Sequence, residues 1–254
     1  LASAFDSAGQ RCSALRVLCL QEEVADHTLT MLRGAMSECR MGNPGRLTTD
    51  IGPVIDADAK ENIERHIQAM RAKGRTVYQA VRENSEDARE WRHGTFVPPT
   101  LIELDSFDEL KKEVFGPVLH VVRYNRNELD KLVEQINASG YGLTLGVHTR
   151  IDETIAQVTG SAKVGNLYVN RNMVGAVVGV QPFGGEGLSG TGPKAGGPLY
   201  LYRLLSSRPQ DAVGVPFARQ DADRPLDAQL KTLIENPLQA LQQWAAGRPE
   251  LQAL

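Results

Sequence analysis

Apolar residues near the start of the chain change from a compact run to helical spacing. Residues 16–20 are rich in Leu and Val and predict a buried strand. The next segment, residues 22–40, carries apolar side chains at the spacing of one helical face, namely Val24, Leu29, Leu32 and Met36. Gly42-Asn43-Pro44-Gly45 then predicts a break, because Gly and Pro interrupt regular structure.

A second helix is predicted over residues 56–73. Three apolar side chains stand there at i, i+4 and i+7, namely Ile63, Ile67 and Met70. Gly74 is a suitable residue to end this helix. Residues 76–81 then predict a strand, and residues 83–92 are polar enough to predict a solvated loop.

The following part of the chain alternates predicted strands with predicted helices. Strands are expected over three ranges, residues 118–124, 143–148 and 166–169. A helix is expected from a capping Asn127 through Ala138, with Leu129, Leu132, Val133 and Ile136 facing inward, and another over residues 152–162. This alternation predicts an α/β fold with a largely parallel sheet and flanking helices.

Residues 174–198 are rich in glycine and give almost no helical signal. A loop of this length inside a compact domain is more often functional or interfacial than idle. Beyond Pro209 the composition changes, with a polar stretch over 211–225 and helical spacing over 226–254. We therefore predict one domain over residues 1–208, followed over 209–254 by a linker and a helical tail that starts a further segment.

Composition narrows the class of protein. Hydrophobic residues make up 41% of the chain, charged residues 23%, and the net charge is -3, which fits an ordinary globular protein. No cluster of Lys and Arg supplies the phosphate neutralisation that nucleic-acid binding needs, and no apolar run is long enough to span a membrane. Three cysteines without a C-x-x-C pair and no signal peptide predict a reducing cytoplasm. The five histidines are scattered, so no metal site is expected.

Cys12 is the residue best suited to covalent chemistry. It stands in Gly9-Gln10-Arg11-Cys12-Ser13, where a turn glycine and a neighbouring cation favour an accessible thiolate, the reactive form of cysteine. Taken alone the pattern is weak, because a single Cys is more often a small buried residue. Cys19 and Cys39 have that structural interpretation, since one lies in an apolar run and the other on a predicted helix.

Two further segments have features of a ligand site. In Glu113-Val114-Phe115-Gly116-Pro117 a carboxylate at a tight turn could accept hydrogen bonds from a sugar diol, although a turn before a strand explains the same pattern. The glycines around Pro182-Phe183-Gly184-Gly185 let backbone approach a ligand, although a surface loop is the simpler interpretation. No G-x-G-x-x-G follows a strand, so this segment is not a dinucleotide fingerprint.

The ordered set of motifs is more specific than any one of them. Gly-Gln-Arg-Cys is followed by Gly42-Asn43-Pro44, Ile51-Gly52-Pro53, Glu-Val-Phe-Gly-Pro, Tyr168-Val169-Asn170 and Pro-Phe-Gly-Gly. Over residues 8–198 the set closely resembles the aldehyde dehydrogenase superfamily. The resemblance implies that family's catalytic (cysteine) domain over residues 1–208.

Two segments narrow the resemblance. Residues 174–185 and 189–198 look like those of the L-glutamate-γ-semialdehyde (pyrroline-5-carboxylate) dehydrogenases, and residues 200–208 with the tail are similar to the long bifunctional proline utilisation A family. The resemblance implies a fragment of an NAD-dependent enzyme that oxidises this semialdehyde to L-glutamate in proline catabolism. Proteins of that family begin earlier and continue past the end of this chain.

The resemblance also assigns roles to individual residues. Cys12 would attack the aldehyde to give a thiohemiacetal, which loses hydride to NAD and becomes a thioester that water hydrolyses. The backbone N–H of Cys12 would stabilise the oxyanion. The substrate-binding residues would be Ser13, Gly175, Ala176 and Phe183, and the cofactor-binding residues Glu113, on the nicotinamide ribose, and Phe115.

The same resemblance implies that part of the machinery lies elsewhere. In the family the nucleotide-binding domain, the acid proposed to activate water and the Asn of the oxyanion hole precede the nucleophile. The fragment alone is therefore expected to bind NAD weakly and not to turn over, and FAD would belong to a separate upstream domain. Expected partners are L-glutamate γ-semialdehyde, the rest of the parent polypeptide and a second copy in a homo-oligomer, with no nucleic acid or membrane contact through this segment.

Two alternatives remain open. A general aldehyde dehydrogenase of another substrate is disfavoured by the loop that contains Gly175 and Ala176. A non-catalytic oligomerisation or scaffold module on this fold is disfavoured by the retained Cys12, Glu113 and glycine-rich motifs.

Overall fold

The structure is a computed structural model that describes residues 1–81, 93–177 and 179–204. The chain divides into two units, Leu1–Tyr200 and Leu201–Leu254, and the first contains every described strand and α-helix. The loop predicted at residues 83–92, the domain boundary predicted after residue 208 and the predicted helical tail lie outside the described residues.

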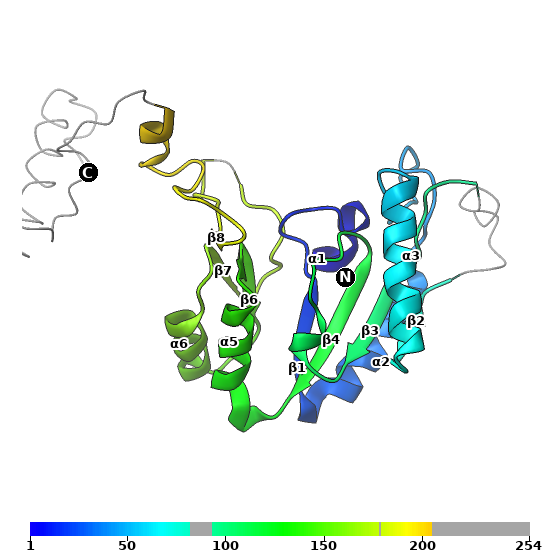
Figure 1. Ribbon diagram of the computed structural model, residues 1–254, viewed down its shortest axis with the longest axis horizontal. Helices are drawn as coiled ribbons and strands as arrows, with labels where there is room; N and C mark the ends of the chain where they lie inside the picture. Colours follow the sequence, from blue (N-terminus) through cyan, green and yellow to red (C-terminus); the bar gives the residue numbers. More distant parts are fainter. Residues whose placement is uncertain (82–92, 178, 205–254) are drawn as a thin grey trace, which may run out of the picture. The chain divides into compact units, whose positions relative to one another are not determined.

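A four-stranded sheet organises the first part of the larger unit (Figure 1). Its strands stand in the order β1-β4-β3-β2 and comprise β1 (Val17–Gln21), β2 (Val77–Gln79), β3 (Thr100–Leu104) and β4 (Val118–Tyr124). β4 pairs in parallel with both β1 and β3, while β2 runs antiparallel to β3. The prediction of a largely parallel sheet is therefore confirmed.

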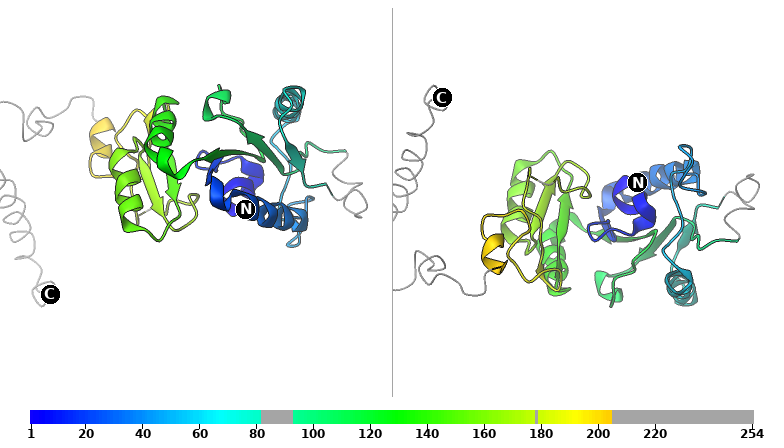
Figure 2. Two further views of the ribbon diagram at one scale, coloured as in Figure 1. Left: turned by 90° about the horizontal axis from the view of Figure 1, so that it is seen from below. Right: turned by 90° about the horizontal axis from the view of Figure 1, so that it is seen from above.

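Helices α2 (Glu22–Glu38) and α3 (Ala57–Ala72) cover opposite faces of this sheet (Figure 1, Figure 2). α3 begins as predicted, because the Asp56 side chain accepts a hydrogen bond from the Ala59 N–H at 2.8 Å. Its predicted inward positions are all buried, namely Ile63, Ile67 and Met70. On α2, Val24 is half exposed and Ala25 faces the core in its place, so that part of the prediction was wrong.

Strand β3 was not predicted, although it lies inside the sheet between β4 and β2. Two prolines precede it and Glu103 interrupts its apolar run, so the sequence pattern is weak. The fold compensates this charge, because the Glu103 carboxylate accepts hydrogen bonds from Arg33 at 2.5 Å and Arg123 at 3.0 Å. Leu101 and Ile102 are fully buried and anchor the strand in the core.

A smaller α/β arrangement follows along the chain. Strands β6 (Thr144–Val147) and β7 (Asn166–Val169) pair in parallel, and β5 (Tyr141–Gly142) pairs antiparallel with β8 (Glu186–Gly187). The helices that accompany them are α5 (Leu129–Ala138) and α6 (Asp152–Ser161).

The start of α5 differs from the prediction. Asn127 does not cap the helix. Instead, the Asn125 side chain accepts from the Asn127 N–H at 3.0 Å and begins a 3₁₀ turn, η3 (Arg126–Glu128). α5 continues from that turn at Leu129. The reason is local, because an Asn side chain bonds an N–H two residues ahead as readily as it caps an α-helix.

Two histidines form a hydrogen-bonded pair between α3 and β4. The Nε2 atoms of His66 and His120 lie 2.9 Å apart, and Nδ1 of His120 lies 3.2 Å from the carbonyl oxygen of Arg16. Because a carbonyl only accepts, Nδ1 of His120 donates, and its Nε2 accepts the proton of His66. Burial, more than any other cause, lowers the pKa of His120 to about 4 and also lowers the pKa of His66.

We predict that the chain loses stability as the pH falls below about 6.5, the ordinary pKa of His. Unfolded His120 then binds a proton that the folded residue does not bind, so the free energy of unfolding should fall by about 2 kcal/mol by pH 5. Urea unfolding at several pH values measures this loss. His120→Gln should flatten the dependence and His27→Gln, at an exposed site, should not. Equal slopes for the wild type and His120→Gln would contradict the assignment.

Candidate active site

The two motif-bearing loops meet because each directly precedes one of two neighbouring parallel strands. Residues 9–16, the Cys12 loop, lead into β1, and residues 113–117 lead into β4. These strands pair with Val17 opposite His120. Starting ends of parallel neighbours lie at the same edge of a sheet. Side chains that are 97 positions apart in the sequence, Arg16 and Glu113, therefore come into contact.

The loops touch through their backbones at Gly9. This residue is buried with a φ of 65°, and a Cβ built there would lie 2.2 Å from the Gly116 carbonyl oxygen. Ser7 and Ala8 just before it also have left-handed backbone conformations, with φ of 56° and 53°. Non-glycine residues rarely adopt this conformation, and it concentrates at functional sites. The close contact requires a residue without a side chain at position 9.

Arg16 joins the same two loops through its side chain. Its Nε donates to Glu113 Oε1 at 2.9 Å, and its Nη2 donates to the Arg11 carbonyl at 3.0 Å. Nη1 donates to the carbonyls of Gly9 at 2.5 Å and Gly116 at 3.5 Å. One guanidinium thus bonds acceptors on both loops.

The surroundings of this guanidinium are partly buried. Arg16 lies over the ring of Phe115, 4.6 Å from its centroid, and the Arg16 side chain is 16% exposed. Burial lowers the pKa of Arg16, while the hydrogen bond and charge of Glu113 and the charge of Cys12 act in the opposite direction. This cation therefore lies beside the loop that carries Cys12, because it bonds the carbonyls of Gly9 and Arg11.

Gln10 fixes the other flank of the Cys12 loop. Its Nε2 donates to the Pro53 carbonyl at 3.3 Å, and its Oε1 accepts from the Ile55 N–H at 2.8 Å. The Ile-Gly-Pro motif at 51–53 is thereby connected to the Gly-Gln-Arg-Cys motif. Both segments act here as structural supports.

Of the three cysteines, only Cys12 is exposed, while its neighbour Ser13 is buried. Cys19 lies in β1, where burial raises its pKa to about 12. Cys39 follows α2 and is partly buried, with its Sγ 3.7 Å from the Ala35 carbonyl oxygen. Cys12, the cysteine predicted from the sequence to be the nucleophile, is therefore the exposed one.

The glycine-rich segment is connected to the Cys12 loop through Ser3, in the short helix α1 (Ala2–Phe5). The Ser3 carbonyl accepts from the Leu15 N–H at 2.7 Å, and its Oγ accepts from the Met173 N–H at 3.3 Å. Gly175, two residues further on, is exposed with a φ of 83°, a conformation that glycine adopts without steric cost.

The structure brings together some of the predicted site residues but not all. Contacts join the Cys12 loop directly to Glu113 and Phe115. Ala176 and Phe183 are half-buried, and Phe183 exchanges backbone hydrogen bonds of 2.9 Å with Ala195. Among the described residues, no hydrogen bond joins Phe183 to the Cys12 loop.

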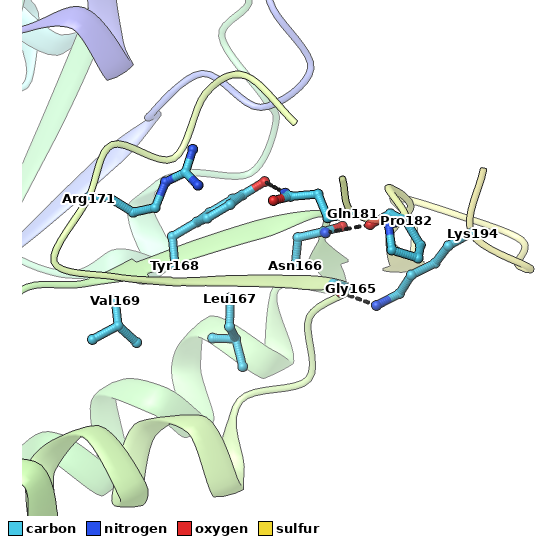
Figure 3. Close-up of a pocket in the computed structure, with 9 residues that line it drawn as sticks. All are labelled: Gly165, Asn166, Leu167, Tyr168, Val169, Arg171, Gln181, Pro182 and Lys194. Atoms are coloured by element: carbon cyan, nitrogen blue, oxygen red, sulfur yellow. Dashed lines mark hydrogen bonds between the residues drawn. The ribbon is translucent and has the colours of Figure 1, made fainter. Parts of the chain in front are cut away.

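A hollow of about 400 Å³ lies along β7 and not at Cys12 (Figure 3). Tyr168 accepts a hydrogen bond from Gln181 at 2.8 Å there, and the Arg171 guanidinium lies 4.9 Å from the Tyr168 ring centroid. Figure 3 shows Leu167 and Val169 pointing to the opposite side of the strand, toward the helices. None of the predicted site residues lines this hollow, so it gives no support to their roles.

Arg16 and Gln10 were missed by the reasoning from sequence. The basic residue next to the nucleophile is Arg11, which is exposed and donates to Ser7 Oγ at 3.0 Å. Arg16 looked like the first residue of a strand, and its role depends on a loop that is distant in sequence. Gln10 carried no local signal beyond its place in the Gly-Gln-Arg-Cys motif, and Arg16 carried none beyond its place at the start of a predicted strand.

The described residues form neither a metal site nor a membrane-spanning helix. Within the described residues, no group of three His, Cys, Asp or Glu side chains could hold a metal ion. No helix in that part of the chain has the length and apolar character needed to cross a bilayer.

We predict that Gly9→Ala lowers the free energy of unfolding by at least about 2 kcal/mol, because it combines left-handed strain with a clash against Gly116. Gly34→Ala is the matched control. Gly34 lies within α2, where an added Cβ would meet nothing within 4 Å, and the change should stabilise by about 0.5–1 kcal/mol. Denaturant unfolding measures both variants. A Gly9→Ala chain as stable as the wild type would show that the two loops do not touch.

Comparisons with known proteins identify the family of the chain. The chain matches the Aldehyde dehydrogenase family over residues 1–208. It is 98% identical to the bifunctional protein PutA of Klebsiella aerogenes over all 254 residues, which are 19% of that protein. It is 36% identical to a 1-pyrroline-5-carboxylate dehydrogenase of Bacillus cereus over 203 residues, which are 79% of this chain and 38% of the relative.

Solved structures give the same result. A mutant of proline utilization A from Bradyrhizobium japonicum is 51% identical with a TM-score of 0.72, over 79% of this chain and 20% of that one. The chain thus spans about a fifth of the length of these PutA relatives. The fold expected from the motifs is confirmed, and the chain belongs to the aldehyde dehydrogenase family.

Proposed function

We propose that this chain is the catalytic-cysteine part of an NAD-dependent dehydrogenase that oxidises L-glutamate γ-semialdehyde to L-glutamate in proline catabolism. The observation that carries the proposal is the exposed Cys12 in a loop that Arg16 joins to Glu113. Relatives named PutA and 1-pyrroline-5-carboxylate dehydrogenase support this substrate over a general aldehyde.

Cys12 acts as the nucleophile in this mechanism. Its sulfur adds to the aldehyde carbon and forms a thiohemiacetal, and loss of hydride from that carbon leaves a thioester that water hydrolyses. The Cys12 N–H makes no hydrogen bond within the described part of the chain, so it can donate to the developing oxyanion. NAD, when bound, accepts the hydride.

Glu113 and Phe115 fit a cofactor on chemical grounds. The Glu113 side chain is 37% exposed, and only its Oε1 bonds Arg16, so the carboxylate has a second oxygen for the hydroxyls of a ribose. Phe115 beside it is 45% exposed and offers an apolar surface. Glu113 would bind the nicotinamide ribose, and Phe115 would contact the cofactor beside it.

Small and polar residues would hold the substrate. The Ser13 hydroxyl and the backbone N–H groups of Gly175 and Ala176 would bind the α-carboxylate, and Phe183 would pack on the aliphatic chain. Exposed backbone at Gly175 supports this role, because anions bind well to unobstructed N–H groups. The hydrogen bonds of Ser3 with Met173 and Leu15 connect the start of the glycine-rich segment to the Cys12 loop.

The remaining parts of the enzyme are assigned to the rest of the parent polypeptide. It would supply most of the NAD contacts, the acid that activates water and, in a separate domain, FAD. We also propose assembly as a homo-oligomer in the cytoplasm.

Selective alkylation tests the role of Cys12. At pH 8 a thiol with a pKa near 12 is only about 10⁻⁴ thiolate, so iodoacetamide should label Cys12 at least about 100-fold faster than Cys19. Partly buried Cys39 should react at an intermediate rate. Peptide mass spectrometry over a time course gives the three rates. Labelling of Cys12 at the rate of Cys19 would contradict an accessible nucleophile.

Turnover tests the reaction itself. The parent polypeptide should reduce NAD with L-glutamate γ-semialdehyde, and Cys12→Ser should lower kcat at least about 10³-fold, because a serine hydroxyl is not ionised near neutral pH. Cys39→Ser is the control and should keep the rate. The 254-residue chain alone should produce no NADH. An active Cys12→Ser enzyme, or a simple aliphatic aldehyde used equally well, would refute the proposal.

A further inference from the structure

We propose that Arg16 is a positioning residue that holds the Cys12 loop and the Glu113–Gly116 turn as one unit. The nucleophile and the carboxylate assigned to the ribose would then keep a fixed relation during the reaction. The inference rests on the proposed function and deepens it, because it gives Arg16 a role of its own in the reaction.

The hydrogen bonds of Arg16 have the pattern of a cross-link. Within the Cys12 loop they reach the carbonyls of Gly9 and Arg11, on either side of Gln10. In the loop that precedes β4 they reach the Glu113 carboxylate and the Gly116 carbonyl. A planar guanidinium with five N–H groups can serve four acceptors in different directions, whereas the compact ammonium of Lys cannot.

The backbone of Arg16 is also fixed. Its carbonyl accepts from the backbone N–H of His120 at 3.0 Å and from His120 Nδ1 at 3.2 Å. Val17, the next residue, pairs with His120 across β1 and β4. The side chain therefore extends from a rigid sheet edge, which makes it a suitable reference point for two loops that lack regular pairing.

A simple ion pair with Glu113 does not explain this arrangement. A partly exposed pair contributes little by itself, and three of the four acceptors of Arg16 are uncharged carbonyls. Those three bonds can persist when Glu113 turns to bond a ribose hydroxyl. Arg16 would then keep the loops together in both states of the carboxylate.

Kinetics of the parent polypeptide test the proposal. Arg16→Met should lower kcat and raise the KM for NAD, each by about tenfold, because small misplacements of reacting groups reduce rates strongly. Arg16→Lys should act in the same direction, since one ammonium cannot bridge both loops. Arg123→Lys is the matched control. Arg123 pairs with Asp26 and Glu103, away from the Cys12 loop, and its substitution should leave both constants unchanged.

A double variant shows whether Arg16 acts through Glu113. If it does, Arg16→Met combined with Glu113→Gln should raise the KM for NAD no further than Glu113→Gln alone. If the increases in the KM for NAD caused by the two single substitutions multiply in the double variant, the proposal is overturned. Wild-type kinetics in Arg16→Met would also overturn it.

Alkylation separates positioning from folding and from failure of the proposed function. Arg16→Met should change the rate of Cys12 labelling several-fold while Cys19 stays protected, and an unchanged Cys12 rate would overturn the proposal even without an NAD assay. If Cys19 becomes reactive in Arg16→Met, the substitution has opened the core. The labelling rates of Arg16→Lys then take the place of those of Arg16→Met in this test. An unchanged KM for NAD in Glu113→Gln would instead refute the cofactor role in the proposed function.

Discussion

Parallel pairing of β1 with β4 is the constraint on which the candidate site depends. It aligns the amino ends of two strands whose preceding loops are far apart in sequence. The loops then approach closely enough for the backbones of Gly9 and Gly116 to touch and for one guanidinium to bond both. Binding sites of open α/β sheets usually form at the carboxyl ends of strands. Here the residues joined to Cys12 lie at the opposite ends.

Much of the fold was predictable because local patterns carried it. The apolar run at β1, the i, i+4, i+7 spacing on α3 and the limits of β7 agree with the structure. β3 was missed because the charge of Glu103, near its end, is compensated only in three dimensions, by Arg33 and Arg123. Val24 was wrongly placed inward because apolar residues stand on more than one side of the first turn of α2. In the structure Ala25, and not Val24, is buried.

The site was predictable only in part. The motifs identified the family, and Cys12 and Glu113 stood out by their chemistry. Arg16 and Gln10 had no such signal, because their bonds reach residues whose proximity follows from strand order. The roles of Gly175, Ala176 and Phe183 are proposals, since the hydrogen bonds of the described residues connect this part of the chain to the loop through Met173 and Ser3. The role of Ser13, which lies in the loop itself, is a proposal as well.

Trapping the covalent intermediate tests most directly the claim that this loop presents a nucleophile. The parent polypeptide would be mixed with NAD and L-glutamate γ-semialdehyde, quenched in acid within one turnover and mapped by peptide mass spectrometry. We expect the mass of a glutamyl thioester on the peptide that contains Cys12 and its absence from the peptides that contain Cys19 and Cys39. An acyl group on either other cysteine, or turnover without any acylated cysteine, would contradict it.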